Sequence, residues 1–286
     1  MVPSVNAPDT ILPTLNARED TEWLTKATNL VRTLGVVAVE GVLDKDFLTE
    51  ARAAMYRAQA AVLKEVGKEK LDRSDELGVV RLPLKYEPIL ARFLELPEAL
   101  AVIDSLLSPY AVLQFQTGLV LPPKSRPAET KGVFQTRFHM DFPRVLNGAV
   151  VSINLMFAID EYRIENGATQ FLLGSHQQLK PIDVEALRPT AIQGVCPAGS
   201  MIIFDSTLFH AAGTNYSQSD RVAVNHGFVP PWIKQHIDTV RMLGDDVVLR
   251  MPRRTQTLLG WDARVPANLD EYYRPAAERL YKGGQG

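Results

Sequence analysis

The middle of the chain, over residues 112–229, is a series of short apolar segments separated by turn sequences. The segments are rich in Val, Ile, Phe and Leu and occupy residues 112–121, 133–142, 149–159, 169–174, 200–205 and 221–229. Clusters of Pro, Gly, Asn, Asp and Ser lie between them, and such clusters are typical of turns. Many short strands with this punctuation predict a β-sandwich or barrel.

The first third of the chain has helical signals instead. Apolar residues fall at helical spacing over residues 21–33, and the segment LGVVAVEGVL that follows is typical of a short strand after Gly35. Asp44 is a suitable N-cap for a helix over residues 45–66, which are rich in Ala, Leu, Arg and Glu. A further helix is expected over residues 97–107.

We therefore expect one domain over residues 1–286, mostly β with flanking helices. It has a helical N-terminal part at about residues 20–110, a β core at about 111–235, and a helical or irregular C-terminal extension at about 236–286. Neither a Rossmann glycine fingerprint nor a phosphate loop occurs in the sequence. The functional side chains should therefore lie in the β core.

The composition argues against several classes of protein. The net charge is −2 with no basic block, which disfavours binding to nucleic acid or to an anionic membrane surface. The apolar runs are too short to span a bilayer, and the N-terminus lacks the features of a signal peptide. Cys196 is the single cysteine, so it cannot form an internal disulfide or a cysteine-rich zinc site. We expect a soluble, cytoplasmic protein.

The sharpest local motif is the H-x-D sequence at residues 139–141. Residues i and i+2 of a strand project to the same face, so His139 and Asp141 would lie together if residues 133–142 form a strand. His210, which follows another expected strand, is the candidate third ligand. An H-x-D sequence by itself also arises by chance, as a surface pair or as a core histidine with a hydrogen-bond partner.

Two histidines and one carboxylate form a facial triad for a metal ion. The triad occupies one face of an octahedral Fe(II) and leaves three positions for a bidentate co-substrate and dioxygen. A closed structural zinc site would need four protein ligands, and thiolates are lacking here. The residue types therefore favour iron chemistry.

Arg221 lies eleven positions after His210, at the start of the expected strand over residues 221–229. A turn between two antiparallel strands would bring Arg221 back near His210. A guanidinium binds a carboxylate through two parallel hydrogen bonds, and 2-oxoglutarate has a distal carboxylate that needs such a cation. Taken alone, an arginine at the start of a strand is more often part of a surface ion pair.

The sequence ENGATQFLLGSH at residues 165–176 contains two turn signals, Asn166-Gly167 and Gly174-Ser175. His176 within it is a candidate fourth ligand. A histidine in a tight turn more often holds the loop by hydrogen bonds, and we favour that role.

The order of these features resembles the phytanoyl-CoA dioxygenase family. The shared order is H-x-D, then ENG and GSH around a short strand, then a distal His, then an Arg about ten residues later. The segment LGVVAVEGVLDKDFLTEARAAM is similar to the strand and helix that open that family, and HGFVPPW is similar to its closing strand. The resemblance covers about residues 25–235.

This resemblance implies a fold, cofactors and site residues. The fold is a double-stranded β-helix, a cupin-like jelly-roll, with iron at its open end. The requirements are Fe(II), 2-oxoglutarate and O2. By position, His139, Asp141 and His210 match the iron ligands and Arg221 matches the co-substrate arginine, while Gln135 and Thr169 are weaker matches for further co-substrate contacts.

The implied activity is oxidation, chiefly hydroxylation, of an unactivated C–H bond in a small organic molecule, with release of succinate and CO2; desaturation, epimerisation or ring formation by the same oxidant remain open. Phe138, Met140 and Phe142 surround the metal motif where relatives often have Trp or Gln, so the activity on a branched acyl-CoA does not carry over. A specialised metabolite or an acyl derivative remains a suitable substrate. A homodimer is a common state for enzymes of this size.

Two other functions remain open. One is a cupin-like metal enzyme that uses the same triad without 2-oxoglutarate, in which case Arg221 would have no co-substrate role. The other is a catalytically silent binding protein of the same fold, although metal ligands are costly to bury without a metal. For the substrate, Arg137 and Arg144 are candidates for binding an anionic group, and Trp232 and Phe142 are candidates for an apolar wall.

Overall fold

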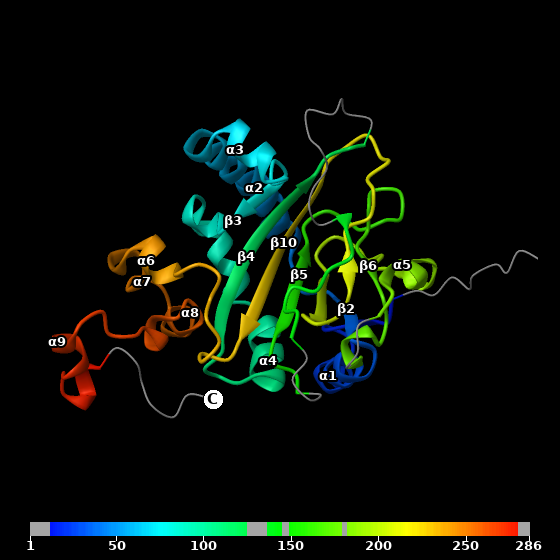
Figure 1. The fold of residues 1–286 in the computed structure, drawn as a ribbon. Coiled ribbons are helices and arrows are strands. Elements are labelled where there is room, and N and C mark those ends of the chain that lie inside the picture. Colours follow the sequence, from blue (N-terminus) through cyan, green and yellow to red (C-terminus); the bar gives the residue numbers. More distant parts are fainter. Residues whose placement is uncertain (1–11, 125–135, 145–148, 179–181, 280–286) are drawn as a thin grey trace, which may run out of the picture.

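The computed structural model describes residues 12–124, 136–144, 149–178 and 182–279. Its largest element is a seven-stranded mixed sheet in which β1 and β2 are parallel and the other neighbours are antiparallel. In spatial order the strands are β1 (Thr14–Asn16), β2 (Val36–Glu40), β8 (Met201–Asp205), β5 (Ile153–Ala158), β10 (Arg221–Val229), β4 (Val112–Leu121) and β3 (Val79–Arg81). The long strands β4, β10 and β5 run side by side through the centre of the molecule (Figure 1).

A second, smaller sheet faces the large one. It consists of β7 (Ile192–Gln193), β6 (Gln170–Phe171) and β9 (His210–Ala211), in that order. A core cluster that includes Phe171 and Phe204 fills part of the space between the two sheets. Side chains on this inner face of the large sheet therefore point into an interior rather than into solvent.

Helices cover the opposite face of the large sheet. The main ones are α1 (Trp23–Leu34), α2 (Lys45–Val66), α3 (Lys68–Arg73), α4 (Pro97–Leu106) and the 3-10 segment η2 (Pro88–Leu94). Shorter helices are α5 (Val184–Leu187), α6 (Thr239–Leu243), α7 (Asp245–Val248), α8 (Arg253–Leu258) and α9 (Leu269–Tyr272). Further 3-10 segments are η1 (Pro83–Lys85), η4 (Ser175–Gln177), η5 (Arg188–Thr190), η6 (Trp261–Ala263) and η7 (Ala276–Glu278). The C-terminal helices α6 to α9 gather to one side of β4 (Figure 1).

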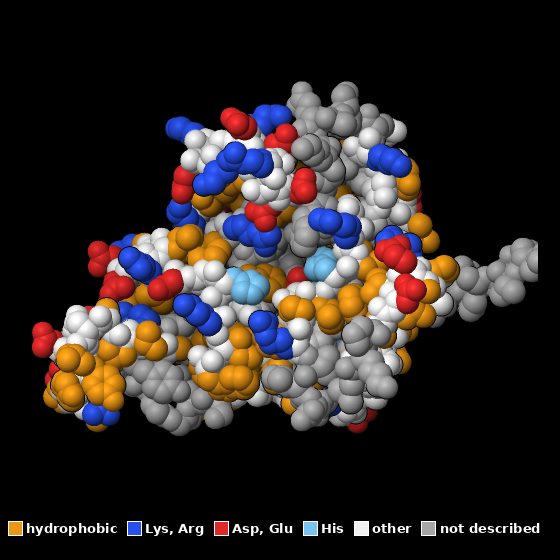
Figure 2. Space-filling view, in the orientation of Figure 1, with side chains coloured by type: hydrophobic (Ala, Val, Ile, Leu, Met, Phe, Trp, Pro, Cys, Tyr) orange, Lys and Arg blue, Asp and Glu red, His pale blue; other side chains and the backbone are white. Residues whose placement is uncertain are grey.

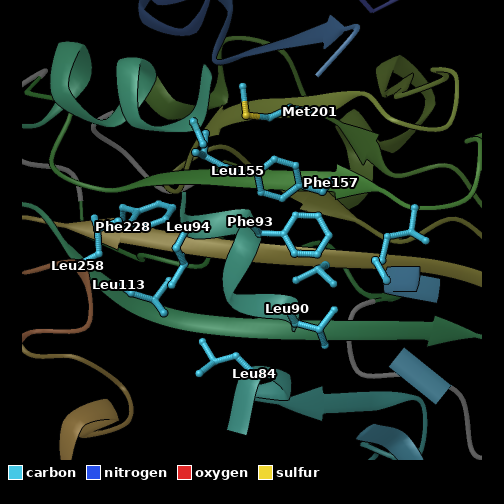
Figure 3. Packing of buried hydrophobic residues seen from close by; sticks show 14 of the residues in the cluster. Leu84, Leu90, Phe93, Leu94, Leu113, Leu155, Phe157, Met201, Phe228 and Leu258 are labelled. Carbon is cyan, nitrogen blue, oxygen red and sulfur yellow. The ribbon is translucent and has the colours of Figure 1, made fainter. Parts of the chain in front are cut away.

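Alternation along the strands sorts side chains between these two layers. In β5, Leu155 and Phe157 point to the helices, where they pack with Phe93 of η2 (Figure 3). Asn154 and Met156, the alternate residues of the same strand, point to the inner face. Because both faces are covered, the central strands are almost continuously buried. Within the described part of the chain, no helix has both the length and the apolar character needed to cross a membrane.

Most of the expected elements are confirmed. The helices expected over residues 21–33, 45–66 and 97–107 correspond to α1, α2 and α4, and the Asp44 side chain accepts a hydrogen bond from the Phe47 amide as an N-cap should. The strand expected at 112–121 is β4. The strand expected at 149–159 is shorter, because β5 begins at Ile153.

The strand expected over residues 133–142 is wrong for its described part. Residues 137–142 form bends and irregular backbone, with an isolated β-bridge from His139 to His210. An apolar residue of this segment anchors the loop to the protein instead: Phe142 is buried, and its amide donates a hydrogen bond to the Ser206 carbonyl oxygen. Residues 133–135 lie outside the described part of the chain.

Candidate active site

Three side chains that are distant in sequence meet at one end of the space between the sheets. One ligand atom from each of His139, Asp141 and His210 lies within 4.8 Å of the others. The two histidine Nε2 atoms are each 3.5 Å from an oxygen of the Asp141 carboxylate. We call these three residues the triad. Two imidazoles and one carboxylate around a common point are a donor set that suits Fe(II).

Backbone pairing brings the two histidines together. The His139 amide donates to the His210 carbonyl oxygen and the His210 amide donates to the His139 carbonyl oxygen, both at 3.0 Å. The two ring centroids are consequently 4.4 Å apart. The bridge thus supplies the proximity that a longer strand was expected to give.

Each imidazole is held so that Nε2 faces the metal position. His139 Nδ1 lies 2.8 Å from the Arg137 carbonyl oxygen, and His210 Nδ1 lies 3.0 Å from the Leu208 carbonyl oxygen. A carbonyl oxygen can only accept, so Nδ1 carries the proton in each neutral ring. The lone pair of Nε2 is then free to bind a cation, an arrangement common among metal-binding histidines.

A chain of hydrogen bonds orients the Asp141 carboxylate. Asn154 of β5 donates its side-chain amide to Asp141 Oδ2, and the Ser206 hydroxyl donates to Asn154 Oδ1 at 3.3 Å. Burial alone would raise the pKa of Asp141, but the facing imidazoles of His210 and His139 outweigh it and lower the pKa well below the usual value. A divalent cation acts in the same direction, so Asp141 is a charged ligand at neutral pH.

The GSH turn supports His210 from behind. The Ser175 hydroxyl accepts a hydrogen bond from the Phe209 amide at 2.9 Å, directly before His210. The turn itself is tied to the end of α1, where His176 Nε2 lies 3.3 Å from the Arg32 carbonyl oxygen. Gly35 has a φ of +92°, and a Cβ there would lie 2.7 Å from His176 Nδ1, so the close approach requires glycine. His176 therefore has the structural role we favoured, outside the cluster of candidate metal ligands.

The triad lines a cavity of about 110 Å³, which we call the triad cavity. The inner face of the large sheet supplies much of its wall, including Thr117 and Leu119 of β4, Ala223 and Asn225 of β10, and Met156 of β5. Figure 2 shows the cavity mouth as a hollow near the centre of one face. Histidine side chains are visible at the hollow, with Lys and Arg side chains around it (Figure 2).

Arg221 begins β10 on the same inner face as Ala223 and Asn225. Its side chain is 1% exposed, and its Cζ lies 4.1 Å from the centre of the Tyr162 ring. None of its three guanidinium nitrogens has a hydrogen-bond partner among the described residues. A buried, unpaired cation is unfavourable by several kcal/mol. The geometry therefore fits an anionic ligand that neutralises Arg221, as the distal carboxylate of 2-oxoglutarate would.

A family model for phytanoyl-CoA dioxygenase matches residues 31–223, well over half of the chain. The chain belongs to the phytanoyl-CoA dioxygenase family. An uncharacterized protein of Mycobacterium tuberculosis is 49% identical over 268 residues, which cover 94% of this chain and 98% of the relative. A more distant relative, dioxygenase olcK of Penicillium canescens, is 32% identical over 113 residues, 38% of this chain and 35% of its own length.

Solved structures share the fold of this family member. AviO1 from Streptomyces viridochromogenes has a TM-score of 0.56 and 19% identity, and the match covers 73% of this chain and 95% of AviO1. SnoN, a non-heme alpha ketoglutarate dependent epimerase from nogalamycin biosynthesis, also gives a TM-score of 0.56 and 19% identity, over 73% of this chain and 82% of SnoN. At these identities the likeness shows the fold, and together with the family it supports an oxygenase.

The remaining predicted residues fall into different places. Thr169 is buried and lines the triad cavity, with its hydroxyl 3.8 Å from the Met156 sulfur. Gln135 lies outside the described residues. Arg137 and Arg144 are both exposed. Trp232, 61% exposed, lines a separate groove beside the C-terminal helices.

Several residues of this family member's cavity were missed at the sequence level. Asn154, which orients Asp141, interrupts the otherwise apolar strand β5, and Asn225 follows an apolar run in β10. That interruption was a usable signal, because a buried amide needs a partner. Arg81 and His236 also line the cavity, but they come from a short edge strand and from a loop that follows β10. Nothing in their local sequence pointed to the metal site.

Proposed function

We propose that this chain is an Fe(II)- and 2-oxoglutarate-dependent dioxygenase that hydroxylates an unactivated C–H bond of a small organic molecule. The observation that carries the proposal is the buried guanidinium of Arg221, which has no partner among the described residues and lies on the inner face that lines the triad cavity. In this proposal the triad binds Fe(II), and Arg221 binds the distal carboxylate of 2-oxoglutarate. Thr169, on the cavity wall, is a further candidate contact for the co-substrate.

Bound Fe(II), 2-oxoglutarate and O2 together supply the oxidising power for C–H oxidation, with succinate and CO2 as co-products. The residues of the chain would bind the metal and the co-substrate, orient the substrate and exclude water. The hydrogen bonds of His139 and His210 to backbone carbonyl oxygens fix both rings, so little reorganisation is needed when the metal binds. Phe204 packs at 4.8 Å from the His210 ring and shields that side of the triad from water.

The two facing sheets would together form the double-stranded β-helix of this family, and residues 1–286 would form a single oxygenase domain. A triad enzyme that works without 2-oxoglutarate, or a silent binding protein, would leave the buried charge of Arg221 without an anion. That cost argues against both alternatives.

The test uses anaerobically purified protein with Fe(II) and 2-oxoglutarate. We expect a visible metal-to-ligand charge-transfer band under nitrogen, and slow succinate formation without added substrate once oxygen is admitted. Asp141→Ala should abolish both signals, since it removes the charged ligand of the triad. Absence of the band in the wild-type protein at saturating 2-oxoglutarate would rule out the co-substrate assignment.

A further inference from the structure

A polar stripe crosses the floor of the triad cavity. Register pairing places Met156 of β5, Asn225 of β10, Thr117 of β4 and Arg81 of β3 in one row across the large sheet. All four side chains line the triad cavity. Arg221, the proposed co-substrate residue, lies two rows away along β10, so the stripe is not part of that contact. We call Asn225, Thr117 and Arg81 the polar stripe.

Asn225 is the member of the stripe that most needs a ligand. Its Oδ1 is buried and has no hydrogen-bond partner among the described residues. Its neighbours on the same face of β10 are Ala223 and Gly227, which offer no side-chain polar group. Leaving a buried amide unpaired costs about 1–3 kcal/mol, so a partner supplied by a bound molecule accounts for it.

The charge of the stripe is already balanced. Arg81 donates from Nε to Glu76 at 3.1 Å and from a terminal nitrogen to the same carboxylate, and a second terminal nitrogen donates to the Thr117 hydroxyl at 3.0 Å. These bonds use three of the five N–H groups of a guanidinium, so Arg81 retains donors but no net uncompensated charge. A carboxylate ligand would have to compete with Glu76 for this cation.

An aromatic surface adjoins the stripe. The Phe115 ring stacks on the His236 ring with centroids 5.4 Å apart and planes inclined by 16°. The Phe115 ring also lies across Gly227, where a Cβ would approach it to 2.3 Å, so glycine lets the ring lie flat on the sheet. Burial lowers the pKa of His236, which leaves its imidazole uncharged near neutral pH. The wall thus combines an apolar plane with uncharged donors and acceptors.

We propose that the polar stripe, with the Phe115–His236 surface, binds a neutral, hydroxylated ring of the substrate, in which hydroxyl groups bond to Asn225 and Thr117. This proposal rests on the proposed function, because it names the substrate class of the same site. A hydroxyl group both donates and accepts, which matches the amide of Asn225 and the spare N–H groups of Arg81. Because the stripe and the triad line the same cavity, a ring held by the stripe would lie beside the metal position. The alternative is an anionic substrate drawn by the Lys and Arg side chains around the hollow (Figure 2).

Two small probes of equal ring size distinguish these substrates. The first is a vicinal cyclohexanediol and the second is cyclohexanecarboxylate. Binding to the full chain, loaded with Zn(II) and 2-oxoglutarate so that no turnover occurs, is followed by ligand-observed NMR. We expect the diol to bind in the millimolar range usual for such small fragments, and the carboxylate to bind at least about tenfold more weakly.

Three variants locate the binding. Asn225→Leu should weaken diol binding by about tenfold, the usual effect of losing one hydrogen bond to a neutral group. Asn29→Leu, the same exchange on the exposed face of α1, should leave it unchanged. Glu76→Gln releases the charge of Arg81 and should raise carboxylate binding to at least the level of the diol. This last variant alters a partly exposed side chain, so it tests the charge argument even if Asn225→Leu folds poorly.

The outcomes are distinct. The proposal would be overturned if the wild-type protein binds the carboxylate more strongly than the diol, or if Asn225→Leu binds the diol as well as the wild type does. It would also be overturned if neither probe binds at tens of millimolar. The charge-transfer band of the Fe(II) and 2-oxoglutarate complex is measured separately on the wild-type protein. If that band forms while the diol fails to bind, the substrate class is wrong and the oxygenase assignment stands.

Discussion

Strand β10 presents two opposite surfaces to the protein, and each contains buried polar groups. Towards the helices, His226 is fully buried between aromatic rings, and its Nε2 lies 2.9 Å from the Gln116 side-chain amide nitrogen. Gln116 is held in turn by the Leu84 amide at 2.9 Å. Towards the second sheet, the Arg221 guanidinium and the Oδ1 atom of Asn225 are buried and have no hydrogen-bond partner among the described residues.

The two surfaces of β10 differ in how their buried polar groups are satisfied, and this difference distinguishes a stabilising role on the helix side from a ligand-binding role on the inner side. On the helix side the protein supplies a partner for Nε2 of its buried histidine, while Nδ1 has none among the described residues; burial lowers the pKa of His226 to about 3, so the ring stays neutral. On the inner side a permanently charged guanidinium and an amide oxygen have no such partner. A buried charge without a partner costs far more free energy than a neutral ring nitrogen without one, so the inner side points to a ligand that is part of the working state.

Replacing Arg221 should have the largest effect of the substitutions that test this comparison. It should raise the stability of the ligand-free protein and lower the affinity for 2-oxoglutarate. Arg221→Met removes the unpaired charge, so the ligand-free protein should gain about 1 kcal/mol in its free energy of unfolding despite losing the contact with Tyr162. The affinity for 2-oxoglutarate should fall about a hundredfold, because a charge-assisted, bidentate contact is lost. Urea unfolding and anaerobic titration of the charge-transfer band measure the two quantities.

Arg221→Lys is the matched control, since it retains the charge but not the planar fork. It should leave the stability of the ligand-free protein close to that of the wild type. It should weaken the binding of 2-oxoglutarate, but by a smaller factor than Arg221→Met does. If Arg221→Met is less stable than wild type and binds 2-oxoglutarate normally, Arg221 has a structural role and the two surfaces of β10 do not differ in kind.

A somewhat smaller effect is expected at Asn154, which contacts Asp141 from the inner face of β5. Asn154→Leu removes the donor that orients the carboxylate, and the loss of such a supporting bond typically weakens metal binding by about 10- to 100-fold. Ser152→Ala, two hydrogen bonds further along the same chain, should reduce affinity much less. Competition with a calibrated chelator gives both values. Equal effects of the two variants would argue against a role for Asn154 in orienting Asp141.

The sequence predicted the triad and Arg221 because each has a local signal. An H-x-D motif and a histidine and arginine spaced around a turn can be recognised without knowing the fold, and the structure brings His139, Asp141 and His210 together as expected. The predicted reason for their proximity was wrong, because an isolated β-bridge between His139 and His210 takes the place of the expected strand. That bridge joins residues 71 positions apart, and pairing at such separation leaves no periodic signal in either segment.

The polar stripe could not be predicted for a similar reason. It is a row across the three strands β10, β4 and β3, and its members become neighbours only through strand order and register. The order β5-β10-β4-β3 places the last strand of the chain between earlier ones, which no local pattern indicates. By contrast, helices α1, α2 and α4 and strand β4 were predicted closely, because caps and apolar spacing are local properties.

On the helix side of β10, His226 should make stability depend on pH. Its pKa is about 3 when folded and near 6.5 when unfolded, so between these values the unfolded chain holds a proton that the folded protein does not. The free energy of unfolding should therefore fall as the pH falls from 6.5 towards 3, by about 1.4 kcal/mol per unit from this residue. Above pH 6.5 the contribution is constant.

The measurement is the difference between wild type and His226→Gln, because other titrating groups cancel in it. Urea unfolding at pH 7 and at pH 5 should show the advantage of the wild-type protein shrinking by about 2 kcal/mol at the lower pH. A difference independent of pH would mean that His226 takes up a proton as readily in the folded protein as in the unfolded chain, and that the helix side tolerates a buried charge as the inner side does.

The smallest effect is expected at Cys196, which tests whether the protein contains its own anion for Arg221. Cys196 and Tyr162 are backbone-paired beside Arg221, and a thiolate or phenolate there would neutralise the guanidinium without any ligand. Burial raises the pKa of the Cys196 thiol to about 12 and also raises that of Tyr162, so both are neutral at physiological pH. Cys196→Ala should therefore change the affinity for 2-oxoglutarate by no more than about twofold.

In the folded wild-type protein a thiol reagent at pH 8 should react with Cys196 far more slowly than in urea. Rapid labelling, together with tighter 2-oxoglutarate binding by Cys196→Ala, would identify a thiolate as the partner of Arg221. The inner surface of β10 would then be internally paired, as the helix side is.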